Sequence, residues 1–344
     1  MRHMVTIKTI DTISPIPGAD RIEQVTIGGW NIVVGKGIHT PGESVLFFEI
    51  DSFLPKNNPL FTSFSTRGTK NATSPITGED TEGHVLKTAR LRGVYSQGAI
   101  MPLTVSNLRP ESTQEEVDQW AADNGVFKYE PPIAAGNSSA IGSFPTVYAR
   151  KTDAERVQNL TDVFISGLDA GKWQATEKID GTSATFFVDE EGILRAASRN
   201  YEVSLDDPNS FHSRVINMCD MRTWMTEPGM VVQGEIYGEK IQGNPLKVQG
   251  VQFGVFHYRG FDTRPDIVKS ILDTMMVPQL DLVLPDTVSE CVEQVNGLMS
   301  HINPKVNAEG VVWWNVDGDT FAELGGRSNF KAINNKYLLK HTGS

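Results

Sequence analysis

The sequence is poor in cysteine and has no long hydrophobic run. Its 344 residues include only two cysteines, Cys219 and Cys291, so neither a set of disulfides nor a zinc site with four thiolates can form. No stretch of about 18 apolar residues that could cross a bilayer is present, and the first residues lack the apolar core of a signal peptide. We therefore expect a cytoplasmic protein with no membrane partner.

Histidine is scattered and positive charge is in deficit. The seven histidines never stand in the helical i, i+4 arrangement, so the sequence predicts no histidine metal site. There are 31 Lys and Arg residues against 42 Asp and Glu residues, which gives a formal net charge of −11. This balance excludes a uniformly basic surface that coats nucleic acid. A nucleic-acid partner therefore has to be bound by local basic patches.

The chain has an ordinary globular composition, and its length predicts two domains. In the first part, short β-rich runs separated by Gly and Pro turns predict a small β-barrel. These runs cover residues 25–27, 31–34, 44–50 and 98–101. Residues 14–21 and 27–34 resemble the opening of the OB fold appended to aminoacyl-tRNA synthetases. Residues 56–83, rich in Asn, Ser, Thr, Gly and Pro, predict a long surface loop.

A change of composition divides the chain near its middle. Residues 131–145 are rich in Pro, Ala, Gly and Ser and predict a linker, so we expect domains at 1–140 and 141–344. Beyond the linker, the spacing of Thr152 and Glu155 is that of a capping box and predicts a helix over 152–160. Strand and helix patterns then alternate, which indicates a mixed α+β domain.

A basic cluster stands in the first half of the chain. Lys87, Arg90 and Arg92 occupy alternating or nearly alternating positions that a strand would partly project to one face. Such a face could bind the phosphates of a nucleic acid. The other interpretation, a solvated strand face with no ligand, fits the sequence equally well.

The sharpest local feature is Lys178, in Thr176-Glu177-Lys178-Ile179-Asp180-Gly181. Alone, it could be a lysine at a strand end before a turn. A catalytic role requires surroundings that make the amine nucleophilic, because a free amine with a pKa of about 10.4 is almost wholly protonated at pH 7.

Further polar and aromatic groups follow in a fixed order. Glu235 lies beside a glycine turn, Phe256 lies in an aromatic-rich strand, Glu309 precedes an apolar strand, and Lys331 follows near the end. Taken singly, each could be a surface acid, a core aromatic or a solvated cation. Their order along one chain is what favours a shared functional site over these separate structural roles.

This order resembles the covalent nucleotidyltransferase superfamily of ATP-dependent DNA ligases, RNA ligases and mRNA capping enzymes, over residues 145–340 or so. The segments around Lys178 and Lys331 resemble phage T4 double-strand RNA ligase. Residues 90–98 and 151–160, with the OB-like start, resemble most closely the Deinococcus nick-sealing RNA ligase family. The resemblance implies an α+β fold: an OB-like nucleic-acid-binding barrel, then an adenylyltransferase domain of antiparallel sheets with flanking helices.

The resemblance also implies an activity. Lys178 attacks the α-phosphate of ATP to give lysyl-AMP, AMP passes to a 5′-phosphate end, and a 3′-hydroxyl displaces AMP to close the strand. The implied substrate is a nick in duplex RNA or in an RNA/DNA hybrid, and the implied cofactors are ATP and Mg²⁺ or Mn²⁺. We expect the enzyme to act as a monomer.

The resemblance carries a role to each matching position. These are Glu309 as metal ligand, Glu235 at the ribose and a second metal, Phe256 on adenine, Arg199 at the ribose or a nucleic-acid phosphate, Glu177 at the base edge, Asp180 orienting the Lys178 loop, and Lys331 at the α-phosphate.

The sequence departs from the family pattern at Ile333, where relatives have the second lysine of Lys-x-Lys. This leaves open whether Lys336 or another cation assists Lys331. His257 also stands where relatives often have an acid.

Three other functions stay open on the sequence. A non-catalytic RNA-binding protein with a degenerate nucleotide domain is opposed by the intact Lys178, Glu235 and Glu309. A DNA ligase or a GTP-dependent capping enzyme is disfavoured because only 13 residues (344 minus 331) follow Lys331, too few for the C-terminal OB domain of those enzymes.

Overall fold

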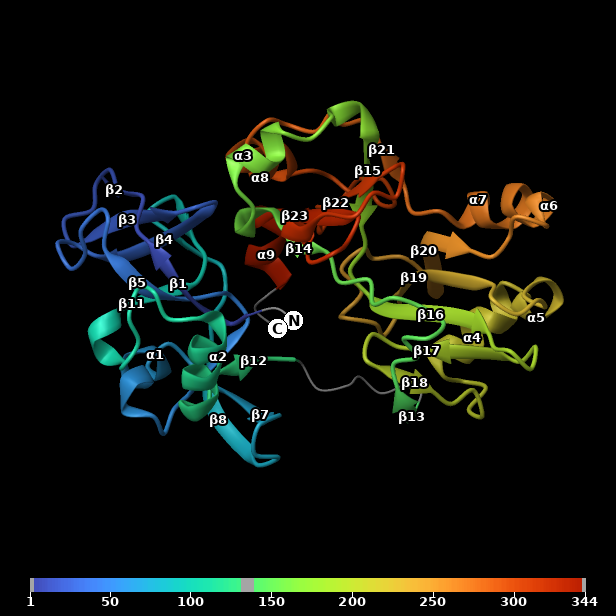
Figure 1. Ribbon diagram of the computed structural model, residues 1–344, viewed down its shortest axis with the longest axis horizontal. Coiled ribbons are helices and arrows are strands. Elements are labelled where there is room, and N and C mark those ends of the chain that lie inside the picture. The colour runs from blue at the N-terminus through green and yellow to red at the C-terminus, as the bar shows by residue number, and fades with distance from the viewer. Residues whose placement is uncertain (1–2, 131–138, 342–344) are drawn as a thin grey trace. The chain divides into compact units, whose positions relative to one another are not determined.

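The computed structural model describes residues 3–130 and 139–341, and the chain divides into two compact units. Unit 1 comprises Met1–Pro132 with Gln158–Thr161 and Leu338–Ser344, and unit 2 comprises Ile133–Val157 with Asp162–Tyr337. Figure 1 shows the elements of both. Among the described residues, every helix is too short or too polar to span a membrane.

Unit 1 is made of short strands with few helices. Its described strands are β1 (Val5–Thr9), β2 (Thr12–Pro15), β3 (Ile22–Ile27), β4 (Trp30–Gly35), β5 (Ser44–Phe48), β6 (Ser52–Pro55), β7 (Lys70–Thr73), β8 (Asp80–Val85), β9 (Ala89–Leu91), β10 (Val94–Ser96), β11 (Ala99–Pro102) and β12 (Phe127–Lys128). They pair antiparallel in the orders β1-β5-β11, β2-β3-β4, β12-β6-β8-β7 and β10-β9. The helical elements are η1 (Pro59–Phe61), α1 (Thr62–Ser65), η2 (Leu103–Val105) and α2 (Gln114–Asp123).

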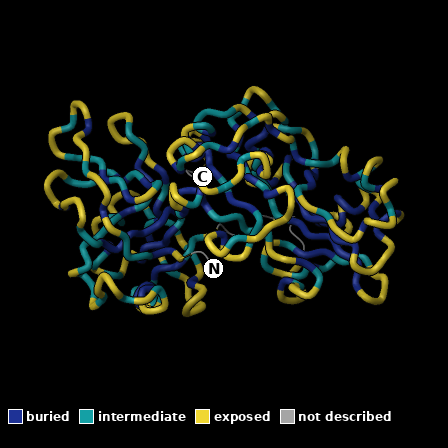
Figure 2. The backbone as a smooth tube through the Cα atoms, turned by 45° about the horizontal axis from the view of Figure 1, so that its top comes forward, coloured by how far each residue is buried: buried dark blue, intermediate teal, exposed yellow. Residues whose placement is uncertain are grey.

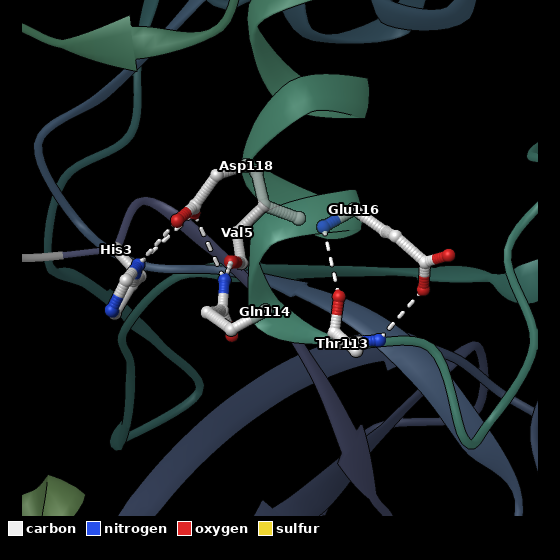
Figure 3. Close-up of polar contacts among 6 residues, drawn as sticks. All are labelled: His3, Val5, Thr113, Gln114, Glu116 and Asp118. Atoms are coloured by element: carbon white, nitrogen blue, oxygen red, sulfur yellow. Dashed lines mark hydrogen bonds and ion pairs between the residues drawn. The ribbon is translucent and has the colours of Figure 1, made fainter.

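Helix α2 closes the core of unit 1 and is fixed at its N-terminus. Thr113 Oγ1 accepts a hydrogen bond from the Glu116 amide, and the Glu116 carboxylate accepts one from the Thr113 amide, which is a capping box (Figure 3). In the same turn, the Gln114 side chain donates to the carbonyl of Val5 on β1 at 2.9 Å. The buried Trp120 then packs among strand residues such as Phe48.

The strand predictions for unit 1 are confirmed, since the four β-rich runs overlap β3, β4, β5 and β11. The prediction of one long loop over residues 56–83 is wrong, because this stretch holds η1, α1 and the hairpin of β7 and β8. Both strands are polar, and only Gly83 and Val85 are buried. A hairpin at a sheet edge needs no apolar run, so composition could not reveal it.

Unit 2 consists of two antiparallel sheets with helices at their flanks (Figure 1). Its described strands are β13 (Ala140–Ser143), β14 (Glu155–Arg156), β15 (Trp173–Lys178), β16 (Thr182–Val188), β17 (Leu194–Ala197), β18 (Tyr201–Val203), β19 (Val231–Gly238), β20 (Val251–Arg259), β21 (Gln279–Leu280), β22 (Gly310–Asn315) and β23 (Asn329–Ile333). One sheet has the order β13-β18-β17-β16-β19-β20, and the other has the order β14-β23-β22-β15-β21, where β14 joins parallel to β23.

The helices of unit 2 are short. They are α3 (Asp162–Ser166), α4 (Phe211–Met218), α5 (Met221–Trp224), α6 (Pro265–Ile267), α7 (Asp273–Met275), α8 (Val288–Val295) and the start of α9 (Asn335–His341), with the turns η4 (Ala170–Lys172), η5 (Val268–Leu272) and η6 (Ala322–Leu324) and the start of η3 (Val157–Asn159). By the division above, α9 and η3 each begin in unit 2 and end in unit 1. The main core lies where α4 and α5 cover the first sheet, and it buries Phe186, Val215 and Trp224. Figure 2 shows that much of the sheet backbone in unit 2 is buried, whereas the connecting loops are largely exposed. The predicted mixed α+β class is confirmed.

Two predictions at the start of unit 2 are wrong. No α-helix covers residues 152–160, where the chain instead forms β14 and the 3₁₀ turn η3, and the first α-helix starts at Asp162. The pairing of β14 with β23 outweighs the local capping signal. In the predicted linker, residues 131–138 lie outside the described residues, whereas Ala140–Ser143 is strand β13. All four residues of β13 are exposed, which explains their linker-like composition.

Candidate active site

Lys178 ends strand β15 and faces a cavity of about 280 Å³ in unit 2. In the register of β15 with β22, Lys178 lies opposite Gly310, directly after Glu309. A Cβ on Gly310 would lie 2.2 Å from the carbonyl oxygen of Ala332, so only glycine allows the strands to approach this closely. This register therefore places Glu309, which is 131 positions further along the chain, beside Lys178, the candidate nucleophile.

Lys178 and Glu309 form an ion pair at the edge of this cavity. The Lys178 Nζ donates to Glu309 Oε2 at 2.6 Å, and the two side chains are only 24% and 16% exposed. Burial by itself lowers the pKa of an amine, but the negative charges of Glu309 and Glu235 outweigh it and raise the pKa of Lys178 above its usual range. Without nucleotide, the amine is therefore held protonated by its partner.

Glu235, on β19, lies close to the same amine. The Asp180-Gly181 turn allows this approach, because a Cβ on Gly181 would lie 2.2 Å from the Ile236 carbonyl oxygen and 3.0 Å from the Glu235 side chain. Burial raises the pKa of Glu235 to about 8, although the charge of Lys178 acts in the opposite direction. A cation that enters the cavity can bind such a buried carboxyl by displacing its proton.

Phe256 and Trp314 form an aromatic wall of the cavity. Between β19 and β20 the register shifts, so that Gln233 pairs with His257 but Gly234 pairs with Val255. Phe256 is the extra residue, and such a bulge turns a side chain out of the regular alternation. The Phe256 ring stacks on Trp314 at 5.9 Å between centroids, with 21° between the planes. A flat base could extend this stack.

Arg199 and Lys331 supply cations to the cavity. Arg199, in the turn after β17, is paired with Asp153 at 2.6 Å, and both side chains are more than a third exposed. Lys331 lies in one row across the sheet with Val312 on β22 and Arg156 on β14. The Arg156 side chain is buried.

The pairing of β23 with its neighbours shows what surrounds Ile333, which stands in place of the second lysine of Lys-x-Lys. Ile333 pairs with Gly310 and is buried, so it places an apolar side chain in the row of Lys178. Lys336 is exposed and lies against Gly297, outside the cavity lining. Arg156, the cation next to Lys331 on β14, is likewise outside the cavity lining, so Lys331 is the cation of this row that lines the cavity.

Glu177 lines the cavity from β15 with a carboxylate that is 2% exposed. Its Oε2 accepts a hydrogen bond from the His301 amide at 2.8 Å, and burial raises the pKa of the carboxyl. Among the described residues, no hydrogen bond reaches the buried Oε1. A buried acceptor oxygen without a protein donor fits a ligand N–H.

Asp180 does not line the cavity. It lies behind Lys178, where its carboxylate accepts a hydrogen bond from the Tyr337 hydroxyl at 2.5 Å. The structure thus brings together the predicted nucleotide-site residues as cavity lining, direct partner or support. The lining ones are Glu177, Lys178, Arg199, Glu235, Phe256 and Lys331.

The donors around Lys178 fit a divalent metal bound together with a nucleotide. Among the described residues, no group of three His, Cys, Asp or Glu side chains could hold a metal by itself. Mg²⁺ is usually bound by one or two carboxylates together with substrate phosphates and water. Glu235 and Glu309, with cations for phosphate beside them, match that chemistry.

The predicted basic cluster in unit 1 is not a single strand face. Lys87 lies in the link between β8 and β9, where burial and the neighbouring charge of Lys70 lower its pKa. Arg90 is on β9, with its guanidinium 5.5 Å from the Tyr95 ring centroid. Arg92 is in the turn of the β9–β10 hairpin at φ 50°. All three sit on or beside one hairpin, but the turn breaks the predicted alternation.

Sequence reasoning missed several residues of this site. Trp314 could have been found from period two, because Val312 and Trp314 alternate toward the cavity on β22. No sequence signal marks Gln242, which lines the cavity from the β19–β20 loop at φ 46°. Tyr337 and Arg156 become visible only through the hydrogen bond to Asp180 and the pairing of β14 with β23.

Comparisons with known proteins agree with this geometry. A sequence model described as an OB-fold domain matches residues 4–103, and the model of the RNA ligase family matches residues 171–333. A Naegleria gruberi RNA ligase solved with PPi is 32% identical, each chain covers 100% of the other, and the TM-score is 0.82. The chain belongs to the RNA ligase family.

Further structures of the Naegleria enzyme are as similar to this RNA ligase. A lysine variant solved with AMP and Mn is 32% identical with a TM-score of 0.81, and both chains are covered to 100%. A second lysine variant, solved with ATP and Mn, is 32% identical with a TM-score of 0.78, over 98% of this chain and 99% of that one. No curated protein matches the sequence.

These findings confirm the predictions of an OB-fold domain followed by an RNA ligase domain, and of a ligase enzyme. The predicted cofactors, ATP and a divalent metal, agree with the complexes of the Naegleria relative. The narrower assignment to the Deinococcus nick-sealing family stays a prediction.

Proposed function

We propose that this RNA ligase is ATP-dependent and seals 3′-hydroxyl/5′-phosphate nicks through a lysyl-AMP intermediate on Lys178. The observation that carries the proposal is the Lys178–Glu309 pair at 2.6 Å on a cavity with an aromatic wall. A half-buried amine with a carboxylate partner, a base platform and nearby cations is what nucleotidyl transfer to a lysine requires.

In the first step, the Lys178 Nζ bonds to the α-phosphorus of ATP while the bond to the bridging oxygen breaks and pyrophosphate leaves. The amine must lose its proton, and Glu309, at hydrogen-bond distance, is the group to receive it. Lys331, which lines the cavity, neutralises charge on the phosphates. Asp153 must release Arg199 before that side chain binds the ribose or a phosphate.

The base of ATP is held by stacking and by one acceptor. Adenine lies on Phe256, with Trp314 continuing the stack. Glu177 Oε1 accepts from the exocyclic amine of adenine, which guanine lacks at that position. This arrangement favours ATP and disfavours the GTP-dependent capping alternative.

Glu309 and Glu235 would hold Mg²⁺ or Mn²⁺, with Glu235 also reaching the ribose. The metal, when bound, spreads the negative charge of the phosphates and favours nucleophilic attack. Because burial raises the pKa of Glu235 to about 8 in the absence of ligands, a metal that binds there is expected to displace a proton.

Nick sealing is tested with four duplexes that carry ribose or deoxyribose on either side of a nick. We expect sealing when the 3′-hydroxyl end is RNA, measured as ligated strand on a denaturing gel. The DNA ligase alternative predicts equal sealing of all-DNA nicks. If the enzyme forms the AMP adduct and seals none of the nicks, nick sealing is the wrong reaction and the adduct serves another acceptor.

We propose that the hairpin cluster Lys87, Arg90 and Arg92 in unit 1 binds the phosphates of the nicked duplex. Reversing the charge of Arg90 and Arg92 to glutamate is expected to weaken duplex binding by roughly tenfold or more at low salt, and to lower the slope of log Kd against log salt by about 2. The matched control reverses Lys36 and Arg109, which are exposed in the same unit. Unchanged affinity and slope in the Arg90/Arg92 variant would show that the hairpin does not contact the duplex.

We also propose that the enzyme is a cytoplasmic monomer of the Deinococcus nick-sealing branch. The resemblance of residues 90–98 and 151–160 to that branch supports this assignment.

A further inference from the structure

Tyr337 makes a polar contact with the active site, although it does not belong to the segment around Lys178 that resembles the known ligases. It lies in the first turns of α9 and is 4% exposed. Its hydroxyl donates to Asp180 Oδ2 at 2.5 Å, so it ties the last helix to the turn directly after Lys178. A phenol buried this deeply usually has a polar partner, and here that partner is a carboxylate two residues from the nucleophile.

Asp180 is close to every charged group around the nucleophile. Its negative charge acts on Lys178, Glu235 and Glu309 alike. Three carboxyl groups therefore lie near one ammonium group, yet only Glu309 contacts it in the hydrogen bonds of the described residues. Something must keep the Asp180 carboxylate from becoming a second partner of Lys178.

Asp180 is half-buried, so its carboxylate has lost part of its water and gains from protein donors. Without the Tyr337 hydroxyl, the Lys178 ammonium, with which Asp180 already interacts electrostatically, is a donor that this carboxylate can turn to. An ammonium group shared between two carboxylates has its nitrogen drawn away from the cavity where the α-phosphate would bind. The hydroxyl of Tyr337 supplies the donor that removes this competition.

We infer that Tyr337 is a positioning residue for the nucleophile: its hydroxyl holds the Asp180 carboxylate away from Lys178, so that Glu309 alone governs the amine. The inference rests on the proposed formation of lysyl-AMP at Lys178. It assigns Tyr337 to the first step of the reaction only, because the closure of an already adenylylated nick does not use Lys178 as a nucleophile.

The test compares two rates in the same preparation of Tyr337→Phe enzyme. One is single-turnover formation of the AMP adduct from ATP, and the other is sealing of a nick that already carries AMP on its 5′-phosphate. We expect adduct formation to fall roughly tenfold or more while sealing stays within about twofold of wild type. A loss of folded protein lowers both rates equally, so their ratio reports the positioning role even if the variant is partly unfolded.

Tyr258→Phe is the matched control. Tyr258 is in the same unit, on β20, and packs against Phe261 away from the cavity lining. Its loss of a hydroxyl is expected to leave the ratio of the two rates unchanged.

A double-mutant cycle with Asp180→Ala identifies the partner through which Tyr337 acts. In the Asp180→Ala background, Tyr337→Phe is expected to have no further effect on adduct formation. Equal loss of both steps in Tyr337→Phe, or full additivity with Asp180→Ala, overturns the inference. If wild-type enzyme forms no adduct at all, the proposed function fails instead, so the two failures are distinct.

Discussion

Lys178→Ala is expected to abolish the covalent AMP adduct completely. In the proposed mechanism the Lys178 Nζ bonds to the α-phosphorus, and in the structure it is the amine with a carboxylate partner at the cavity. The wild-type enzyme, incubated with labelled ATP and Mg²⁺ or Mn²⁺, should give a radioactive protein band that is acid-labile, as a phosphoramidate is. The variant should give none.

Three comparisons sharpen this experiment. Lys172→Ala removes an exposed lysine that is paired with Asp317 in the same unit, and it should leave the adduct intact. Labelled GTP in place of ATP tests the capping-enzyme alternative, and we expect no adduct with it. Lys178→Ala should still seal a nick that already carries AMP, because that step needs no lysine nucleophile. An adduct that persists in Lys178→Ala would contradict the assignment of the nucleophile.

Glu309→Gln is expected to slow adduct formation by roughly a hundredfold or more, which is the usual cost of losing a group that assists proton transfer. The substitution keeps the size of the side chain but removes the charge that pairs with Lys178 at 2.6 Å and the oxygen ligand for a metal. Single-turnover rates measured over a range of Mn²⁺ concentration should show both a lower maximum and a weaker dependence on the metal.

Glu293→Gln is the control for this prediction, because Glu293 is an acid on α8 outside the cavity lining. The thermal unfolding midpoint of both variants, measured in parallel, reports whether folding is affected. If Glu309→Gln keeps the wild-type rate and metal dependence, Glu309 is a structural partner of Lys178 and another group takes the proton.

The sequence predicted a set of residues of which six line one cavity, because their order along the chain resembles that of a known superfamily. Their roles in the reaction stay a prediction. The contacts that these residues make with their neighbours in the fold could not be predicted. Nothing in the sequence indicates that Asp180 is held by Tyr337, 157 positions along the chain, because the contact depends on how α9 packs. Nor does it indicate that Arg156 lies beside Lys331, since the sequence around Arg156 carries a helix signal that strand pairing overrides.

The errors in the fold have a common physical cause. The strands that were predicted, such as β5, carry buried β-branched or aromatic side chains. The strands that were missed, β7 and β13, bury almost nothing and are stabilised by backbone pairing at a sheet edge. Hydrophobic patterning detects burial, so it cannot detect strands whose side chains face solvent.

The register of β15 with β22 determines when the Lys178–Glu309 pair can form during synthesis and folding. Lys178 and Glu309 are 131 positions apart and meet only through this pairing. Contacts across so long a stretch of chain form late, because the entropy of closing the intervening loop must be overcome first. A nascent chain that has not yet emerged past Asn315 therefore lacks the pair altogether. Under the proposed mechanism, a chain truncated before Glu309 keeps Lys178 without its carboxylate partner, so we expect lysyl-AMP to form only after synthesis has passed β22.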